Sequence, residues 1–207
     1  MSAEHDELAQ LGSATVYEAA GREGLVDADL IQLLPGSRAC GPARPVRCGQ
    51  GDNLMVHAAI AEAQPGEVLV LTMPDPEPVA LVGELLATQA RGRGVAALLV
   101  DAAVRDSAEL ADLGLPIWAR WLRVRGADKA AVGSIGEPVE VGGTTIASGD
   151  AVVLDGDGAV AVAAGRVEEV LVAARDRGQR ERVKRAKLED GALSYDLDGL
   201  REIVEGS

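Results

Sequence analysis

The apolar positions of this chain fall into blocks that alternate between helical and strand-like spacing. In three consecutive units, a segment with apolar residues three to four positions apart precedes a short apolar run. The units are residues 54–63 with 67–73, 83–92 with 95–100, and a segment through Leu110 and Leu113 with 115–119. Strands without alternation are typical of a sheet that is covered on both faces. The pattern therefore predicts a right-handed, largely parallel α/β core.

The residues before this core predict a helix and a broken strand. Residues 8–21 have helical spacing, with Ser13 or Thr15 as a candidate N-cap. Residues 37–49 contain strand-like pieces that are interrupted by Gly41, Pro42 and Pro45. Because proline cannot donate a backbone hydrogen bond, we expect an edge or barrel-like strand here rather than a central one.

The spacing changes beyond Gly126. Residues 138–143, 144–154 and 159–164 alternate like antiparallel strands around glycine turns. The segment DGDG at residues 155–158 loosely resembles a calcium-binding loop, but the glutamate that closes such a loop is missing. We therefore interpret this segment as a turn.

The C-terminal part predicts a long charged helix over residues 166–188, interrupted at Gly178. The second half of this helix is too polar for a core element, so it is either solvated or reaches a neighbouring subunit. The tail, residues 191–207, needs a docking partner because of its apolar side chains: Leu193, Tyr195, Leu197, Leu200 and Ile203. We expect an α/β catalytic core over residues 1–165 and a C-terminal helical extension over residues 166–207.

Composition narrows the class of protein. The chain has 207 residues, of which 47% are hydrophobic and only 2% aromatic, so Val, Leu, Ala and Ile must build its core. The net charge of −13 disfavours binding to nucleic acid or to an anionic membrane surface. Since neither a signal peptide nor a membrane-spanning run is visible, we expect a cytoplasmic protein.

The inventory of reactive side chains is short. Cys40 and Cys48 lack metal-ligand spacing, and we expect both to be reduced, partly buried strand residues. His5 and His57 are the only histidines, which argues against a His-based metal site or a Ser-His-Asp triad. Acid–base chemistry must therefore use carboxylates, arginine or water.

A candidate site lies within residues 83–106. The helix that starts at Gly83 offers the free backbone N–H groups of Glu84, Leu85 and Leu86 to a carboxylate or a phosphate. Gly83 also permits a close approach to the backbone. A ligand at this helix start would lie near the residues that follow the next strand, because ligands in α/β sheets bind beyond the carboxyl ends of strands.

Asp101, Arg105 and Asp106 follow that apolar strand. An arginine there can bind an oxyanion while a carboxylate holds a hard cation. The alternative is a turn with a surface ion pair, which is the more frequent meaning of adjacent Arg and Asp residues. Spacing alone leaves both interpretations open.

Six motifs, in order along almost the whole chain, carry a family resemblance. They are ATVYEA at 14–19, GDNL at 51–54, GELL at 83–86, DAAVRD at 101–106, PIWAR at 116–120, and the Asp/Gly-rich segment 149–158. Together they resemble the 4-hydroxy-4-methyl-2-oxoglutarate/4-carboxy-4-hydroxy-2-oxoadipate aldolases and their relative, the regulator of ribonuclease activity A. The resemblance implies a swivelling β/β/α fold, a homotrimer or homohexamer, and a class II aldolase. Such an enzyme uses magnesium or manganese, with cobalt as a further candidate, to stabilise a pyruvate enolate.

The resemblance also implies roles for individual residues. Asp106 would be the direct protein ligand of the metal, Arg105 would bind the pyruvyl oxygen, and the amides from Gly83 to Leu86 would hold the pyruvate carboxylate. Glu84 lies where some members carry an aspartate that positions a proton-shuttling water, and its longer side chain leaves that role open. Glu18 and Glu181 match positions that contact the metal's water molecules, Glu181 from the neighbouring subunit.

The C-terminal residues distinguish branches of this family. KL at 187–188, GAL at 191–193 and LDGLR at 197–201 resemble the extension of the aldolases, which the ribonuclease regulators lack. We therefore expect a lyase that acts on a small 2-oxo acid, with oxaloacetate decarboxylation as a side activity. Lys129 is interpreted as structural, since no Schiff-base lysine is required. A non-catalytic ribonuclease regulator is the alternative, and a methyltransferase is disfavoured by the lack of a glycine-rich nucleotide loop.

Overall fold

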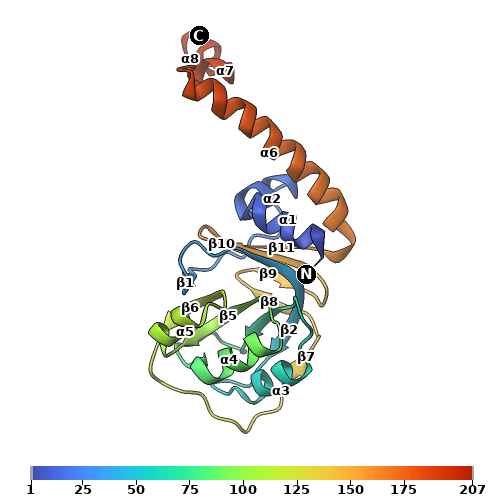
Figure 1. The fold of residues 1–207 in the computed structure, drawn as a ribbon, viewed down its shortest axis with the longest axis vertical. Coiled ribbons are helices and arrows are strands. Elements are labelled where there is room, and N and C mark those ends of the chain that lie inside the picture. Colours follow the sequence, from blue (N-terminus) through green and yellow to red (C-terminus); the bar gives the residue numbers. More distant parts are fainter. Residues whose placement is uncertain (1, 207) are drawn as a thin grey trace.

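A computed structural model describes residues 2–206 as a mixed α/β domain with a curled sheet and a projecting C-terminal helix (Figure 1). The first half contains α1 (Ala3–Leu11), α2 (Ser13–Ala19), β1 (Ile31–Gln32), β2 (Ala39–Arg47), α3 (Leu54–Glu62), β3 (Val68–Thr72), β4 (Ala80–Val82), α4 (Glu84–Gly92) and β5 (Ala97–Val104). The second half contains α5 (Ser107–Leu113), β6 (Ile117–Leu122), β7 (Ser134–Ile135), β8 (Val139–Val141), β9 (Thr144–Ile146), β10 (Ala151–Asp155), β11 (Gly158–Val162), a 3-10 turn (Ala164–Arg166), α6 (Val167–Glu189), α7 (Ser194–Leu197) and α8 (Leu200–Glu205).

The expected parallel core is confirmed. Within the described residues, the strands follow the order β1-β6-β5-β3-β2-β10-β11, with β4 beside β5 and β7 beside β2. The neighbours β2–β3, β3–β5, β4–β5 and β5–β6 are all parallel. Helices α3, α4 and α5 cover this part of the sheet, and Leu69, Leu71 and Leu98 are fully buried in the core beneath them (Figure 1). The fold is thus the α/β arrangement that the sequence predicts, and its sheet is curled.

Strand β2 is central, so the expectation of an edge strand is wrong. Ala39–Pro42 pair with β10, Ala43 to Arg47 pair with β3, and Val46 and Arg47 also pair with β7. Both prolines lie where the strand changes partners: Pro42 is the last residue paired with β10, and Pro45 falls between the β10 and β7 pairings. Backbone donors are needed least at such positions, which is why a central strand tolerates them.

The expected N-terminal helix is two helices. Gly12, with φ 87° and ψ 159°, breaks the chain between α1 and α2. Ser13 is the first residue of α2 rather than its cap, and its Oγ donates to Asp155 Oδ1 at 2.5 Å. Asp155 also accepts from the Ser13 N–H at 2.8 Å. The tight β10–β11 hairpin, in which Asp155 pairs with Gly158, confirms the turn at DGDG.

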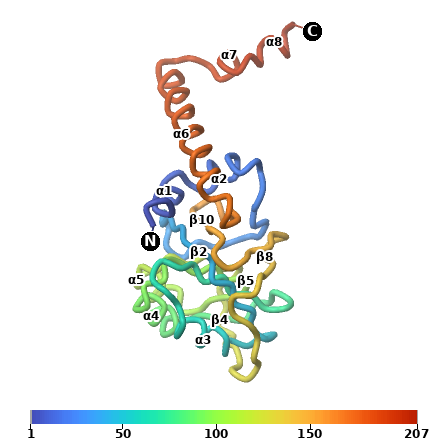
Figure 2. Tube along the Cα trace, turned by 90° about the vertical axis from the view of Figure 1, so that its right-hand side faces the viewer, coloured from blue at the N-terminus to red at the C-terminus, as the bar shows by residue number. Residues whose placement is uncertain are grey.

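Helix α6 is continuous through Gly178, so the predicted interruption is wrong. A methyl group at Gly178 would lie 3.2 Å from Leu11 Cδ2, and the glycine therefore serves the close packing of α6 against α1. Val170 and Leu171 on the first half of α6 are buried in a core shared with α1, α2 and β10, and Ala174 is buried as well. The second half projects away from the sheet (Figure 1, Figure 2).

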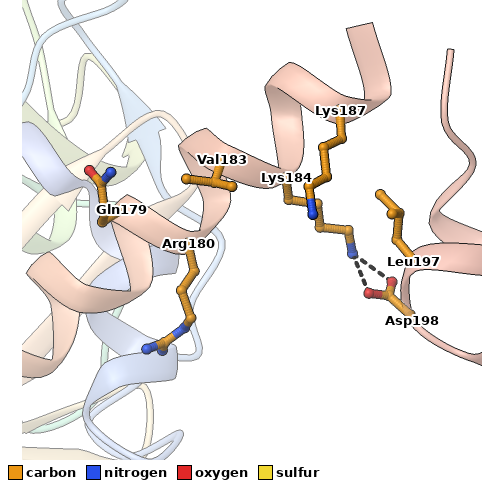
Figure 3. Close-up of a pocket in the computed structure, with 7 residues that line it drawn as sticks. All are labelled: Gln179, Arg180, Val183, Lys184, Lys187, Leu197 and Asp198. Carbon is orange, nitrogen blue, oxygen red and sulfur yellow. Dashed lines mark hydrogen bonds and ion pairs between the residues drawn. The ribbon is translucent and has the colours of Figure 1, made fainter. Parts of the chain in front are cut away.

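The C-terminal tail contacts the last turns of α6, and α7 and α8 then lead away from that helix (Figure 2). Lys184 Nζ binds both carboxylate oxygens of Asp198, the closer at 2.5 Å. Val183 and Leu197 line the groove of about 320 Å³ between α6 and α7 (Figure 3). Apolar side chains of the tail stay exposed, among them Leu193, Ile203 and Val204. Within residues 2–206, no helix combines the length and apolarity needed to cross a bilayer.

Candidate functional site

The two ends of the segment 83–106 meet at the carboxyl ends of β4 and β5. Strand β5 is longer than expected and runs to Val104, so Asp101 lies inside it, where it is buried and forms an ion pair with Arg120 of β6. Arg105 and Asp106 directly follow the strand end. The Arg105 N–H donates to Val82 O at 3.0 Å, which joins the end of β5 to the end of β4. The start of α4 therefore lies beside Arg105 and Asp106.

Gly83 is packed directly against both of these side chains. A methyl group at Gly83 would lie 2.5 Å from Asp106 Oδ2 and 3.1 Å from Arg105 Nε. Asp106 has a left-handed backbone, φ 62° and ψ 47°, and caps α4 by accepting from the Glu84 N–H at 3.0 Å. The N–H groups of Leu85 and Leu86 remain as helix-start donors, since their helical partners would lie before the helix begins. The amides, the arginine and the aspartate thus form one cluster.

The Arg105 guanidinium lies between two glycines and is half exposed. Its Nε is 3.8 Å from Asp106 Oδ2, and the two side chains are 50% and 41% exposed. A methyl group at Gly126, in the loop after β6, would lie 2.8 Å from the Arg105 NH1. Glycine on both sides leaves the guanidinium accessible to a ligand. The contact with Asp106 is longer than a direct hydrogen bond, so both groups keep capacity for other partners.

A cavity of about 210 Å³ opens beside this cluster. Gly83, Leu86, Arg105 and Asp106 line one side, and the remaining lining includes three polar side chains: Asn53, His57 and Lys129. Glu84 contributes its backbone N–H to the cluster, and its side chain is not among those that line the cavity. The cavity has the size of a small organic acid and combines two cations with one carboxylate.

Two polar atoms in this cavity are buried without a partner. Asn53 Nδ2 donates to Leu81 O at 2.9 Å, which turns Oδ1 into a free acceptor. His57 Nε2 also has no hydrogen-bond partner. A buried polar atom without a partner is costly, and a ligand that bonds to it removes the cost. Sequence reasoning assigned no role to Asn53 or His57 and interpreted Lys129 as structural, yet Asn53 and His57 are four residues apart and share one helix face.

Asp52 holds the two walls of the cavity together. Its carboxylate accepts from the Leu54 N–H at 2.8 Å in α3, and from Ala130 and Ala131 at 2.6 and 3.0 Å in the loop that carries Lys129. Burial raises the pKa of Asp52, but these three backbone donors outweigh it and lower the pKa below its usual value. The charged form of Asp52 therefore fixes Lys129 relative to Asn53 and His57.

Asp106 fits a hard cation with few protein ligands. Within residues 2–206, no three His, Cys, Asp or Glu residues are clustered as metal ligands, and Asp106 is the carboxylate among the residues that line the cavity. Magnesium binds in this way, because it keeps several waters and takes one or two carboxylates together with substrate oxygens. The half-exposed Asp106 carboxylate, one oxygen of which is bonded to Glu84, leaves room for such a ligand set.

Glu18 and Glu181 do not join this cluster. Glu18 is on α2 and Glu181 on α6, and both helices lie across the sheet from α3 and α4 in two perpendicular views (Figure 1, Figure 2). The two glutamates instead contact Arg177, at 3.7 Å for Glu18 and 2.8 Å for Glu181. One chain thus brings together Gly83, Arg105 and Asp106 but holds its two glutamates elsewhere.

Comparison with known proteins shows the family of this chain. The family model described as "RraA-like: Aldolase/RraA" matches residues 13–161, which include both ends of the candidate site. The chain belongs to the RraA-like family. A relative from Halalkalibacterium halodurans, named "Putative 4-hydroxy-4-methyl-2-oxoglutarate aldolase", is 32% identical over 162 residues, or 78% of this chain and 77% of the relative.

Solved structures of RraA-like proteins share the fold. RraAS2 from Streptomyces coelicolor, described as an unusual member of the RNase ES inhibitor RraA protein family, has a TM-score of 0.79 and 28% identity, over 88% of this chain and 96% of that one. The RNA-processing inhibitor RraA from Thermus thermophilis has a TM-score of 0.64 and 26% identity, over 78% and 93%. The RraA-like family thus includes proteins named as aldolases and proteins named as inhibitors of RNA processing.

Proposed function

We propose that this RraA-like chain is a divalent-metal-dependent class II aldolase. It cleaves 4-hydroxy-4-methyl-2-oxoglutarate or 4-carboxy-4-hydroxy-2-oxoadipate to pyruvate and a second oxo acid, and it decarboxylates oxaloacetate as a side activity. The observation that carries the proposal is the packing of Gly83 against Arg105 and Asp106 at the start of α4. The aldolase name of the H. halodurans relative supports it.

Different residues of the cluster bind different parts of the pyruvyl group. The Leu85 and Leu86 amides bind its carboxylate, since a helix start favours anions. The Arg105 guanidinium donates to the C2 carbonyl oxygen. Asp106 would hold a magnesium or manganese ion, which would supply a positive charge close to the C2 oxygen. The cavity beside Asn53, His57 and Lys129 accepts the second carboxylate of the substrate.

The bond changes require only this charge stabilisation and one proton relay. In the retro-aldol reaction the C4 hydroxyl loses its proton, the C3–C4 bond breaks, and the electron pair moves to C3 and the C2 oxygen. Arg105 stabilises that charge, and C3 then takes up a proton to give pyruvate. In oxaloacetate the C3–C4 bond breaks with loss of CO₂ instead. We propose that Glu84 serves the relay through water, because its side chain begins at the helix start beside Asp106.

The proposal extends to the assembly and its setting. We propose a cytoplasmic homotrimer or homohexamer, in which the extension from residue 166 onward reaches a neighbouring subunit. The exposed apolar residues of the tail, Leu193, Ile203 and Val204, support a further contact of this kind.

The deciding experiment measures pyruvate release from 4-hydroxy-4-methyl-2-oxoglutarate and from oxaloacetate, with magnesium and after chelation. We expect turnover that depends on the metal and falls by about 10²–10³-fold in Arg105→Ala, the scale of removing one donor to a developing charge. Arg91→Ala is the matched control, because Arg91 is on α4 as well but donates to Leu113 O away from the cavity. Undiminished activity in Arg105→Ala, or after chelation, contradicts the proposal.

A second candidate is a non-catalytic regulator of a ribonuclease. The structural similarity to RraAS2 and to the T. thermophilis RraA favours it. This function requires binding to a ribonuclease and inhibition of RNA cleavage in a purified assay. Inhibition by a chain that turns over none of the oxo acids would replace the aldolase proposal.

A further inference from the structure

Strand β5 contains one extra residue relative to its neighbour β6. Their pairing is regular as far as Val100, which lies opposite Ala119. The pairing resumes at Ala103, which lies opposite Trp121. Two residues of β5 therefore lie opposite a single residue of β6, Arg120. This arrangement is a β-bulge, a feature that is over-represented next to active sites because it changes the direction of nearby side chains.

The bulge lies where β5 exchanges its neighbour on the other side as well. Strand β3 pairs with β5 as far as Val100, and β4 begins to pair with it at Ala103. In the described part of the chain, the strand pairings thus pass over Asp101 and Ala102 on both sides of β5. Backbone pairing alone does not fix the register across such a gap. Side-chain contacts must therefore define it.

An ion pair joins the bulge to the opposite strand. Arg120 Nε donates to Asp101 Oδ1, and the two side chains are 24% and 3% exposed. The Arg120 guanidinium also lies 5.9 Å from the centre of the Trp121 ring. A carboxylate that is buried this deeply is strongly unfavourable without its partner. Any register that separates Asp101 from Arg120 is therefore disfavoured.

The register of β5 sets the position of Arg105 and Asp106. With the bulge in place, Val104 O accepts from the Arg123 N–H at 3.0 Å. A β5 without the bulge would be displaced by one residue, about 3.3 Å, along β6 and would turn its side chains to the opposite face. Arg105 would then lose its place against Gly126, where an added methyl group would lie 2.8 Å from NH1.

We infer that Asp101 and Arg120 are positioning residues, whose ion pair fixes the bulge in β5 and thereby aligns Arg105 and Asp106 with the start of α4. This inference rests on the proposed aldolase function. Neither Asp101 nor Arg120 is among the residues that line the cavity, and the pair acts through the end of β5. The geometry of the candidate site thus depends on a contact inside the sheet.

An apolar pair in place of the ion pair separates positioning from stability. The double variant Asp101→Leu/Arg120→Met is expected to keep a melting temperature close to that of the wild type, because such a replacement of a buried ion pair is often neutral or stabilising. Its kcat for pyruvate release is expected to fall about 10²-fold, the cost of misplaced catalytic groups. A wild-type kcat in this double variant overturns the inference.

A second ion pair of the sheet provides the matched control. Arg44 of β2 donates twice to Glu67, at 2.6 and 2.9 Å, and the two side chains are 21% and 15% exposed. The pairing of β2 with β3 is regular beside it. Arg44→Met/Glu67→Leu is therefore expected to keep kcat, and a loss equal to that of the Asp101/Arg120 double variant contradicts the positioning role.

Two single variants of Arg120 test the pair in a chain that keeps Asp101. Arg120→Lys retains the charge but not the planar guanidinium, whereas Arg120→Met retains neither. We expect kcat to decrease in the order wild type, Arg120→Lys, Arg120→Met. Equal kcat values across this series overturn the inference.

The dependence on Arg105 is tested by combining variants. Residues that act through one another give non-additive effects. In Arg105→Ala protein, the Asp101→Leu/Arg120→Met pair is therefore expected to lower kcat by less than about tenfold, against about 10²-fold in the wild-type background. A further loss as large as that in the wild-type background contradicts positioning through Arg105.

Hydrogen exchange measures the register of β5 without turnover. The Arg123 N–H donates to Val104 O beyond the bulge, and the Leu98 N–H donates to Pro116 O before it, both at 3.0 Å. In the Asp101→Leu/Arg120→Met variant, exchange at Arg123 is expected to accelerate at least about tenfold, and exchange at Leu98 to stay unchanged. Unchanged exchange at Arg123, or equal acceleration at both amides, overturns the inference. Faster exchange at Arg123 alone, in a protein whose wild type releases no pyruvate, contradicts only the aldolase proposal.

Discussion

Replacing Gly83 by alanine tests the candidate site with the smallest possible change. The backbone of Gly83 is extended, with φ −132° and ψ −174°, so alanine adopts it without backbone strain. The added methyl group, however, would lie 2.5 Å from Asp106 Oδ2 and 3.1 Å from Arg105 Cγ and Nε. Since such contacts are not seen below 3.0 Å, the Asp106 carboxylate must move by at least about 0.5 Å.

This displacement acts on function more than on stability. The two displaced side chains are about half exposed and can rotate toward solvent, so we expect a loss of no more than about 1 kcal/mol in the free energy of unfolding. The site loses the 3.0 Å bond from the Glu84 N–H and the alignment of the metal ligand with the guanidinium. Misplacement of catalytic groups on the ångström scale costs about 10²-fold in rate, or about 2.7 kcal/mol of transition-state stabilisation.

The assay compares kcat/KM for pyruvate release with the melting temperature in the same preparation. Gly92→Ala is the control, because Gly92 ends the same helix and an added methyl group there meets no atom within 4 Å. We expect Gly83→Ala to lose about 10²-fold in kcat/KM with a near-native melting temperature, and Gly92→Ala to keep both. A kcat/KM within threefold of wild type in Gly83→Ala would refute the placement of the reaction at this cluster.

Three further predictions concern the metal, the second carboxylate and the cavity wall. Chelation is expected to abolish pyruvate release and added magnesium or manganese to restore it; release that persists without any metal contradicts the role of Asp106. Lys129→Met is expected to raise KM for 4-hydroxy-4-methyl-2-oxoglutarate about tenfold, since one charged contact is worth about 1.5 kcal/mol. Inhibition by pyruvate, which lacks the second carboxylate, is expected to stay unchanged. Equal effects on both ligands would argue against a subsite for the second carboxylate. The pKa of Asp52 is lower in the folded state than its usual value of 3.8, so its contribution to stability is present above that pH and is lost as pH falls through the folded-state pKa. Asp52→Asn is therefore expected to lower the melting temperature at pH 7, by about 2–4 °C per kcal/mol lost. It is also expected to weaken the dependence of the melting temperature on pH below about pH 4. If that dependence is the same as in the wild type, Asp52 is not the group responsible.

The units of helix and strand could be predicted because their signal is local. Apolar runs such as VAALLV at residues 95–100 are buried except for the half-buried Ala96, and Gly92 and Gly94 separate this run from the preceding helix. The wrong predictions concern positions whose structure depends on residues that are distant in the sequence. Pro42 and Pro45 indicate an edge by themselves, and only the pairing of β2 with β10 and β7 shows that both fall at changes of partner. Gly178 by itself indicates a break in the helix. The structure shows instead that this glycine makes room for Leu11 of α1.

Only those residues of the candidate site that have a local signal in the sequence could be predicted. Gly83 and the Arg105–Asp106 pair could be found because a helix start and a strand end are both visible in the sequence. Asn53, His57 and Lys129 come from α3 and from the loop after β6, and no pattern along the chain shows that they face one cavity. The spacing of Asn53 and His57 on one helix face was the available signal. The charged side chain of Asp101 suggested that the strand ends before it, whereas β5 continues to Val104 and buries Asp101.

The shared position of β2 also determines an order for folding. Val68, which pairs with Ala43, emerges soon after it during synthesis, but Ala151, the partner of Pro42, emerges more than a hundred residues later. Until then β2 has an open edge toward the missing β10, and an open edge invites pairing with other chains. Proline offers no N–H to such a partner. Pro45, whose carbonyl faces this edge and accepts from the Gly136 N–H, therefore removes one donor from the nascent edge. Its replacement is expected to lower the yield of soluble protein more than the stability of the folded chain.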